Sequence, residues 1–389
     1  MIGSNQPKRV LHVIGAMDRG GAETLIMNIY RSMDRGAVQF DFLVHDDREC
    51  DYDAEIKRLG GRIFHLFRFT GANYFVYKKA LHSFFGKHHD YCAVHVHIGS
   101  CAAIVITEAK QFGLYAIAHS HATRATLSLP EIGFRFFSYP TRFVADAYLA
   151  CSRQAGIDRF GGSVVSGKRF SVLINGIDTK RYRFNKDTRA RLRNQLHIDE
   201  DCPVFGHVGR FSKEKNHVFL LHAFAHIVQS VPSAKLLLVG RGPLEQEIRG
   251  LSSRLSIGSS VMFLGVRDDI PDLLNVFDVF LFPSVWEGLG ISAIEAQASG
   301  LPCLLSSALP PISSITPFVK SLALDEGEKA WAQAAEGLLK ESSSLDREGC
   351  SEIVRSAGFD IHDTIDALMS LYLKHDLSAL RQISGSDHA

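Results

Sequence analysis

Short apolar runs alternate with longer amphipathic stretches along most of this chain of 389 residues. The short runs are rich in β-branched and aromatic residues and have the length of strands, whereas the stretches between them repeat apolar positions at helical spacing. This alternation is typical of parallel sheets with helices on both faces. In the first half it predicts strands at Arg9–Ile14, Phe40–Val44, Arg62–Leu66, Ala93–Ile98, Tyr115–His119 and Tyr148–Cys151.

A second series of the same kind begins after residue 200. It predicts strands at Val204–Val208, Leu236–Val239, Val261–Leu264, Val279–Phe282 and Cys303–Ser306, and a helical region from Glu328 to about Lys374. We therefore expect two doubly wound α/β domains, residues 1–183 and 184–375, with the polar stretch Lys180–Glu200 as the hinge. Residues 376–389 are expected to form a polar tail that is disordered from Ser384 to Ala389.

The amino-acid composition indicates the cellular compartment in which the protein works. With 46% apolar and 22% charged residues, the chain has the content of a globular protein. Seven cysteines without a C-x-x-C pair indicate neither a disulfide framework nor a zinc knuckle, which favours a reducing environment. No apolar run reaches the ~20 residues that a spanning helix needs, and residues 1–10 lack the apolar core of a signal peptide. We therefore expect a cytoplasmic protein.

Charge is divided unevenly along the chain. Up to Lys180 there are 22 Lys and Arg against 16 Asp and Glu, and after it 21 against 26. An anionic membrane surface or acceptor for the first half would explain this division, and so would unevenly solvated faces. No nucleic-acid partner is expected.

The strongest chemical signal lies in residues 286–302, which read WEGLGISAIEAQASGLP. A Gly-Leu-Gly turn there opens a helix, and the amides of residues 289–291, at the positive end of its dipole, can hold a diphosphate. Glu295, one turn inside, can accept two ribose hydroxyls, whereas Glu287, before the turn, would face the sugar. Alone, both acids could also be ordinary helix charges.

A basic loop follows the first strand of the second half. Residues 209–216 read GRFSKEKN, and doubly wound folds bind ligands beyond the carboxyl ends of their strands. Arg210 and Lys215 could clamp two phosphates and neutralise the charge that develops on a leaving nucleotide. Lys213 and Lys215 could otherwise be solvated loop charges.

With these motifs and others, the sequence resembles the retaining glycosyltransferases of family 4, in particular those that make bacterial capsular and exopolysaccharides. The matching segments span nearly the whole chain: Gly20-Gly21-Ala22-Glu23, Ala118-His119-Ser120-His121, Asn175-Gly176-Ile177-Asp178, Gly209–Asn216, Val239-Gly240-Arg241-Gly242-Pro243, Leu264–Asp269 and Glu287–Glu295. The resemblance implies the GT-B fold, in which two Rossmann-like domains face a cleft.

The resemblance also implies roles for the matching residues. Arg210 and Lys215 would bind the donor phosphates, Glu295 the ribose and Glu287 the transferred sugar. The backbone of Gly20 and Gly21 would approach the reaction centre, where a side chain would obstruct phosphate or acceptor, and that of Val266 and Arg267 would meet the base. The implied donor site comprises Gly20, Gly21, His119, Arg210, Lys215, Val266, Arg267, Glu287, Gly288, Leu289, Gly290, Ile291 and Glu295, and the implied catalytic set is His121, Glu287, Arg210 and Lys215.

The histidine that the family places near the donor sugar could be His119 or His121, because an H-x-H pair puts both on one face of a strand. We favour His121. His95 and His97 alternate in the same way and are expected to be buried histidines that backbone contacts satisfy. Because no carboxylate or cysteine accompanies them in sequence, we predict no metal site.

The resemblance implies a mechanism without a cofactor or metal, in which the departing diphosphate helps to deprotonate the attacking acceptor. Arg241 stands where the family commonly has Asp or Glu, and Gly290-Ile291 replaces residues that touch the donor, so the sugar is left open. Two alternatives are a nucleotide-sugar 2-epimerase, against which the two spaced glutamates argue, and a non-catalytic nucleotide-sugar-binding partner.

The first domain should hold the acceptor. Residues 67–89 mix seven Phe and Tyr side chains with Lys78, Lys79 and Lys87, which resembles an interfacial helix, and residues 132–143 are a second candidate. Aromatic residues along one helix face belong more often to a core. If the membrane interpretation holds, a polyprenyl-diphosphate-linked sugar is the expected acceptor, and the protein would be peripheral at the inner face of the cell membrane.

Overall fold

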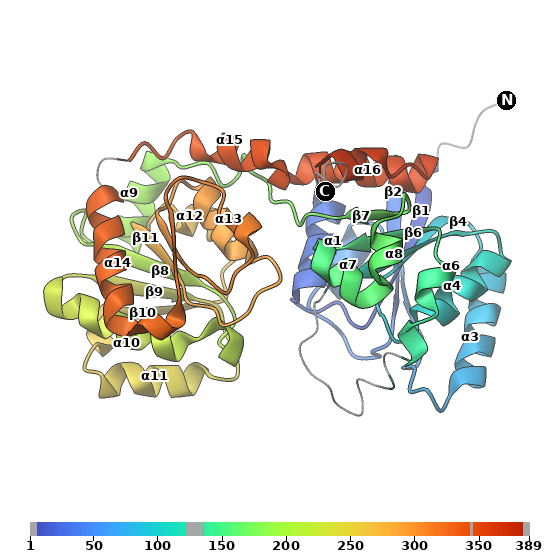
Figure 1. Cartoon of the computed structure of the whole chain (residues 1–389), viewed down its shortest axis with the longest axis horizontal. Coiled ribbons are helices and arrows are strands. Elements are labelled where there is room, and N and C mark those ends of the chain that lie inside the picture. Colours follow the sequence, from blue (N-terminus) through green and yellow to red (C-terminus); the bar gives the residue numbers. More distant parts are fainter. Residues whose placement is uncertain (1–5, 122–132, 134–135, 343–344, 384–389) are drawn as a thin grey trace. The chain divides into compact units, whose positions relative to one another are not determined.

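A computed structural model describes residues 6–121, 133, 136–342 and 345–383 of the chain. The chain forms two compact units (Figure 1): one holds the residues up to Gly176 and those from Ile361 onward, and the other holds Ile177–Asp360. Each unit is built around a parallel sheet with helices on both faces. The predicted α/β class with two Rossmann-like domains is thereby confirmed.

The first unit contains a seven-stranded sheet in the order β3-β2-β1-β4-β5-β6-β7. Its strands are β1 (Lys8–Ile14), β2 (Val38–Val44), β3 (Ile63–His65), β4 (Tyr91–Val96), β5 (Tyr115–Ser120), β6 (Ala147–Ala150) and β7 (Phe170–Val172). Because side chains alternate along a strand, Val10 of β1 enters one core and Leu11 the other. The first core is covered by α1 (Gly21–Ser32), α2 (Asp53–Arg58), α16 (Ile361–Lys374) and α17 (Ser378–Ile383), and the second by α3 (Tyr74–Lys87), α4 (Ala102–Gln111), α7 (Arg153–Phe160) and α8 (Gly162–Val165). A short helix, α6 (Thr141–Val144), precedes β6.

The second unit contains a six-stranded sheet in the order β10-β9-β8-β11-β12-β13. Its strands are β8 (Val204–Val208), β9 (Lys235–Val239), β10 (Val261–Gly265), β11 (Val279–Phe282), β12 (Cys303–Ser306) and β13 (Val319–Leu322). On one face lie α10 (His217–Ser230), α11 (Glu245–Arg254) and α14 (Gly327–Ser342), and on the other α9 (Lys186–Gln195), α12 (Ile270–Leu273) and α13 (Ile291–Ala298). Packed against α13 is α15 (Cys350–Val354).

All predicted strands are present, with ends within two residues of the expected ones. Sequence analysis missed β7 and β13, which have three and four residues and lie at the edges of their sheets. In β13 the central Lys320 and Ser321 are exposed, so this strand lacks the apolar run by which the others were found.

The predicted domain boundaries are wrong at both ends of the second domain. The chain leaves the first unit at Gly176 rather than at residue 183, and it returns to that unit at Ile361. As a result α16, which was assigned to the second domain, packs on the first, where Leu368 and Leu371 are buried beside α1. An amphipathic pattern shows that one helix face is buried, but it does not say against which sheet.

The predicted hinge at Lys180–Glu200 is instead an ordered part of the second unit. Its helix α9 begins at a capping residue, Asn185, whose side chain accepts a hydrogen bond from the amide of Thr188 at 2.8 Å. The amide of Asn185 itself donates to the side chain of Asn275 at 2.7 Å. The polar side chains that suggested a hinge instead bind this segment to the rest of the second unit.

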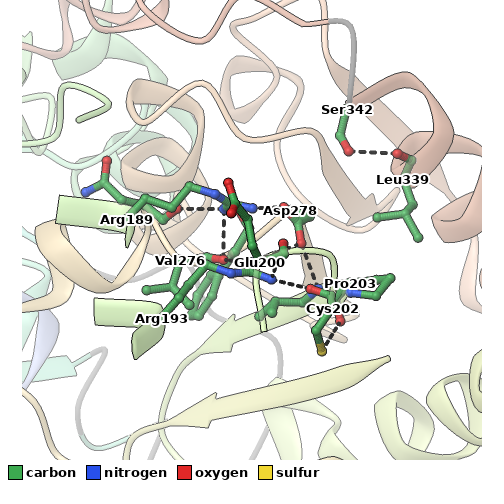
Figure 2. A network of polar contacts seen from close by, with 12 residues as sticks. Arg189, Arg193, Glu200, Cys202, Pro203, Val276, Asp278, Leu339 and Ser342 are labelled. Carbon is green, nitrogen blue, oxygen red and sulfur yellow. Dashed lines mark hydrogen bonds and ion pairs between the residues drawn. The ribbon is translucent and has the colours of Figure 1, made fainter. Parts of the chain in front are cut away.

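Arginines of α9 complete this attachment, as Figure 2 shows. Arg189 donates to the carbonyl oxygens of residues 275–277 and forms a 2.5 Å ion pair with Asp278, while Arg193 donates to the carbonyl oxygen of Val276 at 3.0 Å. Arg193 also binds the carbonyl oxygens of residues 199, 200 and 202 before β8. The five donors of a guanidinium group suit a site with many carbonyl oxygens.

The predicted polar tail, residues 376–389, is wrong for its first part. It begins with α17, whose Leu380 is buried in the first core together with Leu377. Ser384–Ala389, predicted to be disordered, lie outside the described residues.

Candidate active site

Three loops meet backbone to backbone at the carboxyl edge of the second sheet. The amide of Gly240 donates to the carbonyl oxygen of Gly265 at 2.8 Å, which joins the loop after β9 to the end of β10, where the third loop begins. A Cβ added to Gly240, whose φ is 134°, would lie 2.1 Å from the carbonyl oxygen of Gly209, and one added to Gly242 would lie 2.4 Å from that of Phe211. Glycine at 240 and 242 therefore allows the loops after β8 and β9 to stack.

Lys215 and Glu287 meet at this edge. Lys215 Nζ lies 2.5 Å from Glu287 Oε1 and 4.6 Å from the centre of the Phe282 ring, and both side chains are largely buried. The pair joins the loops after β8 and β11, the neighbouring strands at which the strand order of the sheet reverses. Ligands of open α/β sheets bind at this switch point. Arg210, in the same loop as Lys215, is exposed.

The start of α13 lies beside this pair in sequence and carries the predicted phosphate-binding turn. Gly290 precedes the helix in the left-handed conformation, with φ 71° and ψ 54°, and no side chain caps the helix. A Cβ on Gly290 would lie 3.0 Å from Leu309 Cδ2. Leu289 and Gly290 are buried, and Gly288 and Ile291 are half-buried. The first N–H groups of α13 thus lack a side-chain partner, which suits an anion.

Glu295, one turn inside α13, has a partner that sequence analysis missed. The hydroxyl of Tyr182 donates to Glu295 Oε1 at 2.6 Å. Burial raises the pKa of Glu295 to about 7, although the bond from Tyr182 and the charge of Lys215 both act to lower it. Tyr182 stands in a polar segment 113 positions before Glu295, so no spacing signal could have joined them.

The predicted base-binding loop follows β10. Val266 is 44% exposed, and the guanidinium of Arg267 forms a forked pair with Asp269 at 2.7 and 2.6 Å. This fork orders the loop that follows Gly265, the last residue of β10, whose carbonyl oxygen accepts the bond from Gly240.

In the first unit the predicted glycines open α1. Gly20 precedes the helix with φ −106°, and a Cβ there would lie 2.2 Å from Glu23 Oε2, whereas one on Gly21 would meet nothing within 4 Å. Burial raises the pKa of Glu23. The close approach at Gly20 is thus to a side chain of its own helix, and the space beside Gly21 is open.

A cavity of about 320 Å³ lies beyond the carboxyl ends of β1, β2 and β4. These strands include the switch point of the first sheet, between β1 and β4. Its lining includes Gly15, His45, Asp46, Arg68 and Ser100. Sequence analysis did not predict these residues, since they come from four separate segments that carry no recognised motif.

Three histidines from β1 and the ends of β4 and β5 form a hydrogen-bonded chain. His12 Nδ1 lies 3.0 Å from His97 Nε2, and His97 Nδ1 lies 2.7 Å from His121 Nε2. Burial lowers the pKa of His12 to about 3 and that of His121 to about 4, and it keeps the pKa of His97 well below its ordinary value. Because each neutral ring has one donor and one acceptor, all three must carry the proton on the same kind of nitrogen.

A second chain runs beside the first. The hydroxyl of Tyr372, on α16, lies 2.8 Å from His95 Nδ1, and His95 Nε2 lies 3.2 Å from His119 Nδ1. Both ring nitrogens of His95 and of His97 therefore have partners, but these are side chains rather than the expected backbone groups. His95 is buried as expected, whereas His97 is half-buried. The rings of His119 and His121 lie 3.9 Å apart, centre to centre.

Within the part of the chain that the structure describes, these histidines are the residues grouped closely enough to hold a metal ion. His12, His95 and His97 form one group, and His97, His119 and His121 another, with ligand atoms within 4.8 Å of one another. In the structure the nitrogens bond to each other at 2.7–3.2 Å, closer than two ligands of one tetrahedral zinc, which lie roughly 3.3 Å apart at ordinary Zn–N lengths. A metal would have to break these chains.

The aromatic segment predicted as interfacial divides between core and surface. Phe69, Tyr77 and Phe85 are buried, which places them in the core. Phe75 is 82% exposed, and further exposed aromatic side chains from the second predicted segment are Phe136, Tyr139 and Phe143. Ile132 of that segment lies outside the described residues.

Beside these aromatic residues lies a groove of about 680 Å³ between α3, α4 and residues 136–140. Its walls include Tyr74, Ile104, Phe136, Phe137 and Pro140. Of the helices in the described ranges, none combines the length and the apolar character that crossing a membrane demands.

Comparison with known proteins identifies the chain's relatives. The family model described as "Glycosyl transferases group 1" matches residues 188–355. EpsF of Bacillus subtilis (strain 168), which is named a glycosyltransferase, is 34% identical over 379 residues, which cover 95% of this chain and 97% of EpsF. The UDP-Gal:alpha-D-GlcNAc-diphosphoundecaprenol alpha-1,3-galactosyltransferase of Escherichia coli is 32% identical over 149 residues, covering 37% of this chain and 38% of that protein.

The fold has solved counterparts. The crystal structure of Anabaena HepE in complex with UDP and glucose matches with a TM-score of 0.74 at 19% identity, covering 95% of this chain and 100% of HepE. At this identity the match concerns the fold alone.

Proposed function

The chain belongs to the glycosyl transferases of group 1, and on that premise we propose that it is a retaining glycosyltransferase. It moves a hexose or N-acetylhexosamine from a nucleotide-diphosphate sugar, a UDP-sugar, to a polysaccharide precursor. The observation that carries this proposal is the Lys215–Glu287 pair at the switch point of the second sheet. The uncapped start of α13 and the half-buried Glu295 follow it in sequence. Cation, free amides and carboxylate are the groups that a nucleotide diphosphate requires.

Each part of the donor has a proposed partner. Lys215, Arg210 and the amides from Gly288 to Ile291, in the turn that leads into α13, bind the diphosphate. Glu295 accepts the ribose hydroxyls, and the backbone of Val266 and Arg267 meets the base.

Positioning and charge stabilisation perform the catalysis. An acceptor hydroxyl attacks the anomeric carbon while the bond from that carbon to the diphosphate breaks, and the hydroxyl proton passes to a departing phosphate oxygen. Lys215 and Arg210 stabilise the charge that develops there, so the reaction requires neither metal nor cofactor. Glu287 and His121, with His119 beside it, orient the sugar, and the open space at Gly21 admits the reacting groups.

The acceptor is a lipid-linked sugar bound to the first domain. The Escherichia coli relative is named for action on a diphosphoundecaprenol-linked sugar. The exposed Phe136 lines an apolar groove, and the exposed Phe75 and Phe143 contact two other lining residues, Tyr74 and Tyr139. Lys79 and Arg142, close to Phe75 and Phe143 in sequence, add positive charge. We propose that this surface rests on the inner face of the cell membrane, so that the protein is cytoplasmic and peripheral.

A donor screen tests the proposed reaction. Purified protein is incubated with UDP-, GDP- and ADP-sugars, with and without EDTA, and thermal shift and hydrolysis are recorded. We expect one UDP-sugar to stabilise the protein. Its slow hydrolysis should retain the anomeric configuration, and EDTA should not change the rate. Stabilisation without turnover, even with lipid-linked acceptors, would favour a binding partner, and release of an epimerised sugar would favour a 2-epimerase.

Sedimentation with liposomes tests the membrane proposal. The wild type should pellet with vesicles that contain anionic lipid, and a Phe75→Ser/Phe143→Ser variant should remain in the supernatant because it loses two exposed aromatic side chains. Val218→Ser, at an exposed apolar position of the other domain, is the matched control. Equal sedimentation of the wild type with and without vesicles would refute the proposal.

A further inference from the structure

Tyr182 is held firmly beside Glu295. Its carbonyl oxygen accepts a hydrogen bond from Ser299 Oγ, at the end of α13, at 3.0 Å, and its hydroxyl reaches Glu295 Oε1 at 2.6 Å. Three residues later, Asn185 is fastened to Asn275 at 2.7 Å. Tyr182 thus contacts α13 at two points, through its backbone and through its side chain.

We propose that Tyr182 is a positioning residue of the donor site, whose hydroxyl keeps the Glu295 carboxylate ionised and oriented while the ribose hydroxyls bind it. This inference rests on the proposed role of Glu295. A carboxylate has about four lone-pair sites, so it can accept the phenol and two ribose hydroxyls together.

The electrostatics of Glu295 explain why such a donor is needed. Burial favours the protonated form and raises the pKa of Glu295 to about 7. Two groups oppose burial: the hydroxyl of Tyr182, from the segment after β7, and the charge of Lys215, from the loop after β8. Lys215 is itself paired with Glu287, so Tyr182 is the one that bonds Glu295 directly.

A protonated Glu295 would bind the ribose hydroxyls poorly. It has to accept two O–H donors, and a carboxylic acid presents a donor of its own at one oxygen. Nucleotide affinity should therefore depend on the ionised fraction of Glu295, which Tyr182 controls.

Calorimetric titration of UDP between pH 6 and 9 tests the inference. Tyr182→Phe retains the ring and removes the hydroxyl. Since a hydrogen bond to a charged group is worth one pKa unit or more, the midpoint of the pH dependence of Kd should rise by about one unit, with affinity lowered about threefold at pH 7.5 and less at pH 9. Tyr115→Phe, in the other domain, where the ring stacks on His375, is the control.

A second variant tests whether Tyr182→Phe acts through the ionisation of Glu295 rather than through the shape of the site. Glu295→Gln cannot titrate, so adding Tyr182→Phe to it should produce no further shift of the pH midpoint. An unchanged midpoint in Tyr182→Phe alone, or an equal loss of affinity at every pH, would overturn the inference while leaving the donor site in place. Failure of the wild type to bind UDP, GDP or ADP would overturn the proposed function instead, and this inference with it.

Discussion

Glu295→Gln should stabilise the second domain at alkaline pH while weakening nucleotide binding. The folded pKa of Glu295, about 7, lies above its ordinary value of 4.5. Below pH 4.5 the carboxyl is protonated in both the folded and the unfolded chain, so it affects stability little. Between pH 4.5 and 7 the folded chain keeps a proton that the unfolded chain has lost, and stability therefore falls as pH rises.

The size of this effect follows from the shift. A pKa that rises from 4.5 to about 7 on folding corresponds to about 3 kcal/mol of unfolding free energy, and this stability is fully lost above pH 7. Glutamine keeps the shape and can still accept the bond from Tyr182, but it carries no charge into this half-buried site. For a domain of this size, the melting temperature at pH 8 should exceed that of the wild type by about 6–12 °C, and at pH 4.5 the two should agree.

Calorimetric melting at several pH values measures this difference, and UDP titration should show an affinity loss of about tenfold or more, since the amide offers the ribose an N–H donor in place of an acceptor oxygen. Glu326→Gln, at an exposed position of the same domain, is the control. If Glu295→Gln and the wild type melt with the same pH dependence, burial does not raise the pKa of this carboxyl, and the reasoning fails.

Three further variants probe other contacts. Lys215→Met should lower the hydrolysis rate of the donor about 100-fold or more, because the developing phosphate charge loses its cation; a rate near that of the wild type would contradict this role. Arg193→Met should lower the melting temperature of the second domain by about 6–12 °C, because it removes a guanidinium that binds four carbonyl oxygens and Asp278; an unchanged melting curve would contradict it. Tyr372→Phe leaves a nitrogen of the buried His95 without a partner and should destabilise the first domain by about 1–2 kcal/mol, measured as a lower melting temperature, whereas equal stability would show that the bond contributes nothing.

Local patterns in the sequence determined the strands and the loops that carry the candidate site. The apolar runs located eleven of the strands to within two residues, since burial of both faces demands such runs. Parallel strands bring their carboxyl ends to one edge of a sheet, so the loop with Arg210, which follows the first strand of the second half, was expected at the ligand-binding edge of the second sheet.

Only the tertiary structure decided which distant side chains become partners. The sequence by itself did not indicate that Lys215 pairs with Glu287 or that Tyr182 pairs with Glu295. Contacts of this kind depend on how distant loops and segments pack, and they leave no periodic pattern in the sequence. The same holds for α16. Its apolar stripe predicted a helix with one buried face, but its packing on the first sheet, where Tyr372 bonds His95, depends on complementary side-chain packing. Sequence periodicity reports which face of an element avoids water, whereas the long-range fit of those faces selects the neighbours.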